Sequence, residues 1–150
     1  MTMREITRIR RKKGIWTIEW EIGIGSGGSL ADSDRPRPEL PKAFDEMAKF
    51  AVAICELPPS FVPDIAVNWI AWKYEEKNTM VRMNVSRFLR NSVKGITLTT
   101  PWWPYRETDD LQQGHAGNAM IQAMEDLQEE ANRYIDGDRE QGKLNFGEGA

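Results

Sequence analysis

Cysteine and histidine each occur only once in this sequence, and their scarcity excludes several kinds of site. Cys55 alone cannot form an intramolecular disulfide, and its apolar helical surroundings favour a buried structural thiol. Cys55 and the single histidine, His115, lie far apart in the chain and cannot build a typical zinc site. No nucleophile signature accompanies His115. Glu125 and Glu129 fit a solvated helix face better than a magnesium site, so we expect no metal, no cofactor and no enzymatic activity.

Long apolar runs are also missing. No segment approaches the run of about 18 apolar residues that is needed to cross a bilayer. Residues 1–13 are basic but continue into an alternating segment, so we expect no signal peptide. The closely spaced Gly23, Gly25, Gly27 and Gly28 match neither of the common phosphate-binding loops. With a single cysteine, these features indicate a cytoplasmic protein that has no contact with a membrane.

The composition is that of an ordinary globular domain. The chain has 150 residues, of which 40% are hydrophobic and 29% are charged. This length suffices for one domain with a real core. We expect a single α+β domain over residues 1–142 and a C-terminal tail over residues 143–150.

Alternation of apolar and polar residues predicts the strands. Within Ile15–Ile24 every second residue, beginning at position 16, is isoleucine or tryptophan. One face of this strand is therefore expected to pack on a core. Thr7–Lys12 is expected to be a polar edge strand that reaches it through a turn at Lys13 and Gly14. Ile65–Tyr74 is apolar on both sides, which predicts a central strand covered on both faces. Two further strands are expected over residues 81–85 and 96–100.

Helical spacing of apolar residues predicts two helices. The first covers Glu39–Glu56 and the second covers Asn118–Asp136, with Gly137 as its C-terminal stop. Gly25–Gly28 is expected to end the preceding strand, and Ala31–Pro38 is expected to be a polar connection. The resulting order is ββαβββα. The fold class is therefore α+β, with an antiparallel sheet of about five strands packed with two helices.

Charge is distributed unevenly along the chain, although its net value is only -3. Residues 1–13 hold six basic residues and one acidic residue, whereas residues 107–150 hold eleven acidic and three basic residues. Three explanations are open: head-to-tail attraction in an assembly, a basic face for a phosphate-bearing ligand, or two solvated faces of one monomer.

Six tryptophans are many for a chain of this length. The two within Ile15–Ile24 share a strand face with isoleucines and are expected in the core. Trp69 and Trp72 are expected on opposite faces of one strand, with at least one of them buried. Trp102 and Trp103 lie between two prolines in an expected loop, where a large apolar surface needs an explanation. Either this pair fills the end of the core or a subunit interface, or it forms a platform on which bases stack.

Arginines supply the electrostatic half of a candidate binding site. Arg8 and Arg10 are expected on one strand face, where they form a row of cations beside the sheet. Arg35 and Arg37 alternate with prolines and are pre-organised for contact with a carboxylate or phosphate, and Arg106 follows the tryptophan pair. Arginine and tryptophan are also enriched at ordinary protein interfaces. The candidate ligand-binding residues are Trp102, Trp103, Arg106, Arg8, Arg10, Arg35 and Arg37.

Four segments resemble an uncharacterised family of small proteins of tailed bacteriophages and prophages. They are Arg35–Glu39 (RPRPE), Ala53–Pro58 (AICELP), Asn91–Pro101 (NSVKGITLTTP) and Tyr134–Gly142 (YIDGDREQG). The resemblance covers about half of the chain. It implies a phage accessory protein associated with replication and recombination functions in the cytoplasm of a bacterial host. It implies no catalytic residues.

The leading hypothesis is a non-enzymatic phage accessory protein, a homo-oligomer, that binds a nucleic acid or nucleotide through arginines and exposed aromatic rings. The alternative is an anti-defence protein that inhibits or sequesters a host immune protein or a signalling nucleotide. The position of the Trp102 and Trp103 rings separates a binding surface from a subunit interface.

Overall fold

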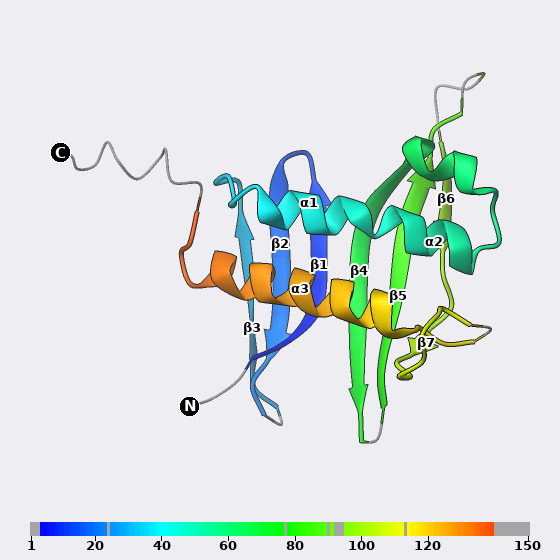
Figure 1. The fold of residues 1–150 in the computed structure, drawn as a ribbon. Helices are drawn as coiled ribbons and strands as arrows, with labels where there is room; N and C mark the ends of the chain where they lie inside the picture. The colour runs from blue at the N-terminus through cyan, green and yellow to red at the C-terminus, as the bar shows by residue number, and fades with distance from the viewer. Residues whose placement is uncertain are drawn as a thin grey trace.

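The computed structural model describes residues 4–23, 25–76, 78–89, 91, 95–112 and 114–139. The expected tail, residues 143–150, lies outside the described residues. Seven strands, three α-helices and one 3₁₀-helix follow one another along the described chain (Figure 1). In chain order they are β1 (Glu5–Lys12), β2 (Ile15–Glu21), β3 (Gly27–Asp32), α1 (Glu39–Glu46), α2 (Ala48–Ile54), η1 (Pro59–Asp64), β4 (Ile65–Glu75), β5 (Asn78–Arg87), β6 (Ile96–Thr99), β7 (Trp103–Pro104) and α3 (Asn118–Ile135).

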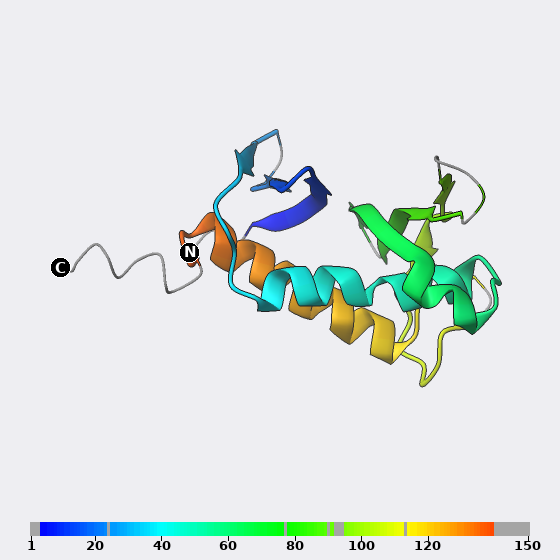
Figure 2. The ribbon, with the colours of Figure 1, turned by 90° about the horizontal axis from the view of Figure 1, so that it is seen from above.

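The strands form one antiparallel sheet in the order β3-β2-β1-β4-β5-β6, and β7 pairs with β5. All three α-helices lie on one side of this sheet, and the other side carries no helix in the part of the chain that the structure describes (Figure 2). The expected α+β class with an antiparallel sheet is confirmed, with more strands and one more helix than expected. Within the same residues, no helix is long and apolar enough to cross a membrane.

The position of β1 differs from the expectation of a polar edge strand. β1 lies inside the sheet, between β2 and β4, and Ile6 and Ile9 of β1 are buried. The strand looks polar in the sequence because Arg8 and Arg10 lie on the sheet face away from the helices, and Arg11 reaches Asp45 of α1. The turn into β2 is confirmed, since Lys13 (φ 53°) and Gly14 (φ 79°) both take the left-handed conformation that tight hairpins require.

The true edge beyond β2 is β3, a strand that covers part of the expected glycine stop and polar connection. Gly28 of β3 lies opposite Trp20 of β2. A Cβ atom on Gly28 would lie 2.4 Å from the Trp20 ring, so only glycine lets the backbone pass this side chain. Gly27 and Gly28 therefore serve close packing within the sheet, whereas Gly25 (φ 73°) lies in the turn before β3, and a Cβ atom there would meet no described neighbour.

The expected helix over Glu39–Glu56 is divided into α1 and α2 at Met47. The Met47 N–H bonds to the carbonyl of Phe44, only three residues back, which tightens the backbone locally. Figure 1 shows α1 and α2 following one another across the sheet beside α3. The second expected helix is confirmed, and Gly137 (φ 96°) ends it.

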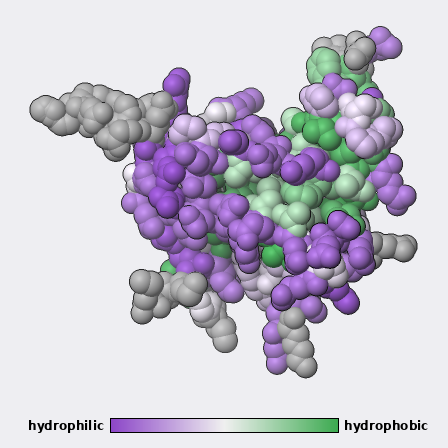
Figure 3. Space-filling view, in the orientation of Figure 1, coloured by the Kyte–Doolittle hydropathy of each residue, from purple (hydrophilic) through white to green (hydrophobic). Residues whose placement is uncertain are grey.

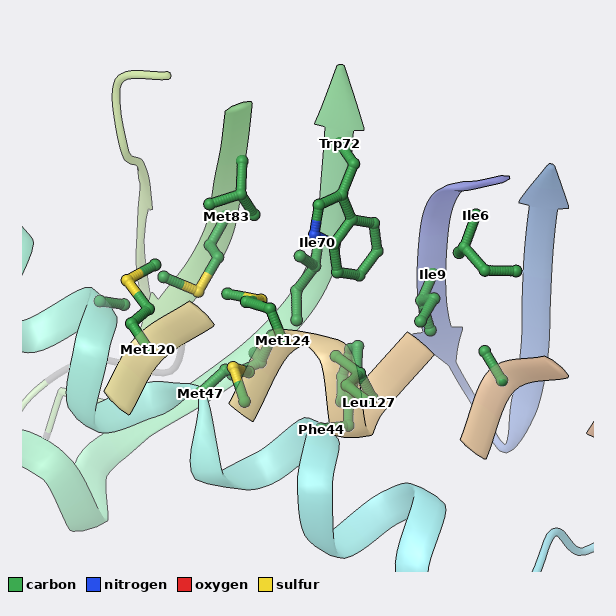
Figure 4. Packing of buried hydrophobic residues seen from close by; sticks show 14 of the residues in the cluster. Ile6, Ile9, Phe44, Met47, Ile70, Trp72, Met83, Met120, Met124 and Leu127 are labelled. Atoms are coloured by element: carbon green, nitrogen blue, oxygen red, sulfur yellow. The ribbon is translucent and has the colours of Figure 1, made fainter. Parts of the chain in front are cut away.

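The core lies between the three helices and the sheet. Figure 4 shows Met120 and Met124 of α3 and Met47 near Met83 of β5 and Ile70 of β4, while Leu127 of α3 lies toward Ile9 of β1. Flexible methionine side chains fill the irregular space between the helical layer and the twisted sheet. The largest fully buried side chains are Tyr134, Phe44, Ile6, Ile9, Ile18, Leu40, Met47, Ile70, Met83, Met120, Met124 and Leu127.

Strand β4 is central, as expected, but its expected cover on both faces is wrong. Ile70 and Trp72 are buried under the helices, whereas Trp69 and Ala71 lie on the face that carries no helix. We call this helix-free side of the sheet the open face. The prediction that Trp69 and Trp72 lie on opposite faces is thereby confirmed.

One ion pair joins the two ends of the described chain, and a second joins its C-terminal end to β3. Arg4 contacts Asp136 at 2.7 Å, and Arg139 contacts Asp32 at 3.2 Å. Part of the basic start and acidic end of the chain is therefore matched within one molecule, without a second copy.

The three tyrosines of the chain predict its behaviour at alkaline pH. Burial raises the pKa of Tyr74 and Tyr105 well above the usual range and raises the pKa of Tyr134 to about 12. Because the unfolded chain ionises its tyrosines near pH 10, this contribution to stability is complete below that pH and is lost as the pH rises through the folded values. We expect tyrosinate absorbance to appear together with loss of circular dichroism. Three tyrosines that titrate near pH 10 in a folded chain would contradict this packing.

Candidate functional site

A row of alternating cations and tryptophans crosses the open face. The Trp69 ring centre lies 4.6 Å from the Arg8 guanidinium and 5.5 Å from that of Arg82. Arg82 also lies 4.6 Å from the Trp102 ring centre, and the Lys73 ammonium lies 4.9 Å from the same ring. We call these five residues the cation–tryptophan row. Each contact is worth about 0.5–1 kcal/mol at an exposed position, so the row is a stable feature of the surface.

The strand register explains why the row forms. Arg8 of β1, Ala71 of β4 and Arg82 of β5 are neighbours across three strands. Because Ala71 has only a methyl group, it leaves room between the two long arginine side chains. A bulge between Val67 and Trp69 shifts the register at this point of β4. The Trp69 ring thus lies beside two guanidinium groups.

Within the described residues, the two arginines of the row lack the carboxylate partners that several other arginines of the molecule have, whereas the lysine of the row, Lys73, lies 3.8 Å from a carboxylate oxygen of Glu75. In the part of the chain that the structure describes, Arg8, Arg10 and Arg82 form no ion pair with a carboxylate, and Nε of Arg82 is buried without a hydrogen-bond partner. Glu19 is the register partner of Arg8, but these two side chains form no ion pair either. Nε of Arg87, outside the row, is buried without a partner as well. What distinguishes the row is that no carboxylate of the described chain neutralises Arg8 or Arg82 by direct contact.

A hollow of about 390 Å³ lies next to the row. Its lining contains no acidic residue. Although Arg11 borders the hollow, its guanidinium reaches the helical side and contacts Asp45 at 2.5 Å. The hollow is lined by Arg8, Arg10, Arg11, Lys12, Asn68, Trp69, Asn84 and Thr97. A small concave site with cations, one aromatic ring and amides suits an anionic ligand with polar edges.

Polar side chains form a hydrogen-bonded ladder beside the same hollow. The Asn68 amide nitrogen donates to Oδ1 of Asn84 and to Oγ of Ser86, both at 2.8 Å. The Asn84 amide nitrogen donates to Oγ1 of Thr99 at 2.8 Å. The ladder joins β4, β5 and β6 and fixes the orientation of both amides.

The structure brings together only part of the predicted ligand-binding set. Trp102, Arg8 and Arg10 lie on the open face, and Trp102 and Arg8 belong to the row. Trp103 of β7 is buried, with 8% of its surface exposed, and its register partner is Val81 of β5. For Trp103 the structure favours the alternative in which the ring plugs the core, so Trp103 does not join the predicted ligand-binding set. Adjacent residues of an extended segment point to opposite sides, so one ring of the pair reaches the open face and the other the core.

The remaining predicted arginines do not join this site. Arg37 lies within 3.9 Å of three carboxylates, those of Glu39, Glu130 and Asp138, and the pKa of Glu39 is held below its usual value by a backbone hydrogen bond and by Arg37. Arg35 is engaged in a contact of its own within the molecule. Arg106 is exposed in the segment after β7 and takes no part in the row. Arg37 therefore fastens the link between β3 and α1 to the end of α3.

Several residues of the open face were absent from the predicted set. Alternation in β5 carries their signal: Val81, Met83 and Val85 are buried, so the polar Arg82 and Asn84 between them must face the other way. Trp69 follows from the same rule applied to β4. Tertiary structure is needed to see that these strands are neighbours of β1.

Other parts of the surface offer less. A hollow of about 910 Å³ near β1 and β2 is lined by Glu5, Glu19 and Glu21, which disfavour an anionic ligand. His115 is half-buried in the segment before α3. Among the described residues, no group of three or more histidine, cysteine, aspartate or glutamate side chains could hold a metal ion.

Comparison of the chain with protein-family models, curated proteins and solved structures finds no match. The resemblance to small phage proteins stays a prediction.

The different positions of the two neighbouring tryptophans can be tested by stability. We expect Trp103→Ala to lower the free energy of unfolding by about 3–5 kcal/mol, because it leaves a cavity in the core. Trp102→Ala should cost about 1–2 kcal/mol, mainly the loss of two cation contacts of about 0.5–1 kcal/mol each. Urea unfolding of both variants measures the difference. Equal losses, or a larger loss for Trp102→Ala, would contradict the assignment of Trp103 to the core.

Proposed function

We propose that this chain binds single-stranded nucleic acid on the open face of its sheet. The observation that carries the proposal is the cation–tryptophan row, with arginines that have no carboxylate partner among the described residues. The row supplies the two interactions that single strands require, which are cations for the phosphates and flat surfaces for the bases.

The geometry favours a single strand over a duplex. Exposed bases of a single strand can stack on aromatic rings or on guanidinium planes, whereas stacked pairs inside a duplex cannot. Both neighbours of Trp69 in the row are guanidinium groups, so a base stacks on a guanidinium plane, or it displaces one guanidinium toward a phosphate. Among the described residues, the open face also carries no protruding helix that would enter a groove.

Electrostatics favours an anion over a second copy of the chain on this face. Two copies placed face to face would bring Arg8, Arg10 and Arg82 toward their own counterparts, and like charges in contact are unfavourable. Phosphates remove this repulsion and release condensed counterions on binding. The proposal needs no catalytic group, and it suits the phage accessory protein in a bacterial host that the sequence predicts.

Binding should therefore depend on salt and on named cations. We expect Arg10→Ala to weaken binding of a mixed-sequence single strand and to reduce the slope of log affinity against log salt by about 0.7, the value for one lost phosphate contact. Trp102→Ala should weaken binding by about 1–3 kcal/mol if a base stacks there. Fluorescence anisotropy with labelled single-stranded DNA, single-stranded RNA and duplex, at several salt concentrations, measures both effects.

Lys42→Ala is the matched control. Lys42 is exposed on α1, on the helical side, and its removal deletes one positive charge far from the row. We expect its affinity and salt slope to equal those of the unmodified chain. Absence of binding to either single strand at low salt would show the proposal to be wrong. Equal losses in Arg10→Ala and Lys42→Ala would show that the open face is not the site.

A second candidate function, binding of a host protein, rests on an apolar patch at the other end of the molecule. Figure 3 shows hydrophobic surface over α2 and η1. Phe88 nearby is 67% exposed and Ile96 is 48% exposed, which is unusual for large apolar side chains. This candidate corresponds to the anti-defence alternative.

The two candidates differ in which variant abolishes the interaction. If the patch binds a host protein, a tagged chain and its Arg82→Ala variant should retain the same partner from bacterial lysate, and Phe88→Asp should lose it. Loss with Arg82→Ala but not with Phe88→Asp, or retention of nothing by the unmodified chain, would exclude the patch as the binding surface.

A further inference from the structure

We infer that the open face distinguishes between bases and prefers adenine, through a two-bond contact from the Asn84 amide. The inference rests on the proposed function, since it concerns the ligand of the same face. It is carried by the amide ladder and not by the cations.

Asn84 lies where a base would be held. It lines the same hollow as Trp69 and Arg10, and its register partner on β4 is Trp69. A base beside the Trp69 ring therefore has the Asn84 amide next to it and the cations of β1 within reach of its phosphate. A cation alone reads the phosphate, whereas an amide reads the edge of the base.

The hydrogen-bonding capacity of Asn84 is half used. An asparagine side chain offers two donors and two acceptor positions. Asn84 accepts one hydrogen bond from Asn68 and donates one to Thr99, both at 2.8 Å. One N–H and one oxygen lone pair of Asn84 have no partner among the described residues. This count is unchanged if the amides of the ladder are all reversed, since Asn84 still gives one bond and accepts one.

One free donor next to one free acceptor is the pattern that asparagine uses to contact adenine. The base presents an amino group beside a ring nitrogen, and asparagine meets both with two parallel bonds. Asn68 is different, because its nitrogen already donates to both Asn84 and Ser86. Asn68 therefore acts as a positioning residue that holds the Asn84 amide, and Asn84 is the residue that contacts the base.

The ladder also has a structural effect, since it ties β4 to β6 beside the bulge. A structural role alone predicts that loss of Asn84 changes stability and leaves the ratio of affinities for different bases unchanged. The ratio is therefore the quantity that separates the two roles.

The test compares single strands of one length that contain only adenine or only thymine. We expect the unmodified chain to bind the adenine strand about tenfold more tightly, within the range for a good two-bond contact. In Asn84→Ala the ratio of the two affinities should fall close to one, while the salt slope stays the same. Thr99→Val keeps the amide but removes the bond that orients it, so an intermediate ratio is expected.

A change in the ligand tests the inference without any change in the protein. A strand whose purine lacks the 6-amino group should lose most of the adenine preference, because one of the two bonds cannot form. Equal affinity for the adenine strand and this analogue, or an unchanged ratio in a folded Asn84→Ala variant, would overturn the inference. Binding without base preference would leave the proposed function intact, whereas absence of binding to every strand would remove both.

Discussion

Burying only one face of a seven-stranded sheet leaves the other face in water, so each strand must satisfy two environments at once. The helices cover the isoleucines, valines and methionines of β1, β4 and β5. On the opposite face, Trp69 and Trp102 present large apolar rings to solvent. Arginine and lysine cover these rings with their apolar stems and cationic heads, a contact that suits both partners. The row of the open face is thus a consequence of covering the sheet on one side only.

Local rules in the sequence account for much of the fold. Alternation in Ile15–Ile24 and helical spacing in Asn118–Asp136 predicted a strand and a helix that the structure contains, because the core imposes these periods directly. The place of β1 inside the sheet was not predictable in this way. Strand order depends on pairing between distant segments, and the polar residues that suggested an edge lie instead on the open face. Strand β3 was not predicted for a related reason. Gly28 suggests a strand end in the sequence, but it is a glycine because the Trp20 ring of the neighbouring strand lies against it.

The candidate site was predictable only in part, because its residues come from separate segments. Trp102 and Arg8 were in the predicted set, but the residues that link them, Trp69 and Arg82, become neighbours only when β1, β4 and β5 pair. The sequence alone did not distinguish arginines that are available to a ligand from arginines that form ion pairs within the chain. Arg37 resembles a ligand-binding arginine in the sequence, yet it lies among carboxylates contributed by α1, α3 and the segment that follows α3. Whether an arginine is available depends on where the carboxylates lie, which is a property of the folded chain.

The same distribution of carboxylates explains how a chain with a net charge of -3 keeps a locally basic surface. A ligand responds to the local field more than to the total charge. Glu39, Glu46, Asp126, Glu129 and Glu130 line a groove between α1 and α3, on the helical side. The sheet separates this groove from the arginines of the open face. Screening over about 8–10 Å at physiological salt limits how far the acidic groove acts on these arginines. The nearer carboxylates are those of β2, where Glu19 is the register partner of Arg8 and lines a separate hollow with Glu21. For the proposed ligand, an anionic strand, the favourable part of the sheet is therefore the surface around Arg8, Arg10 and Arg82, away from the carboxylates of β2.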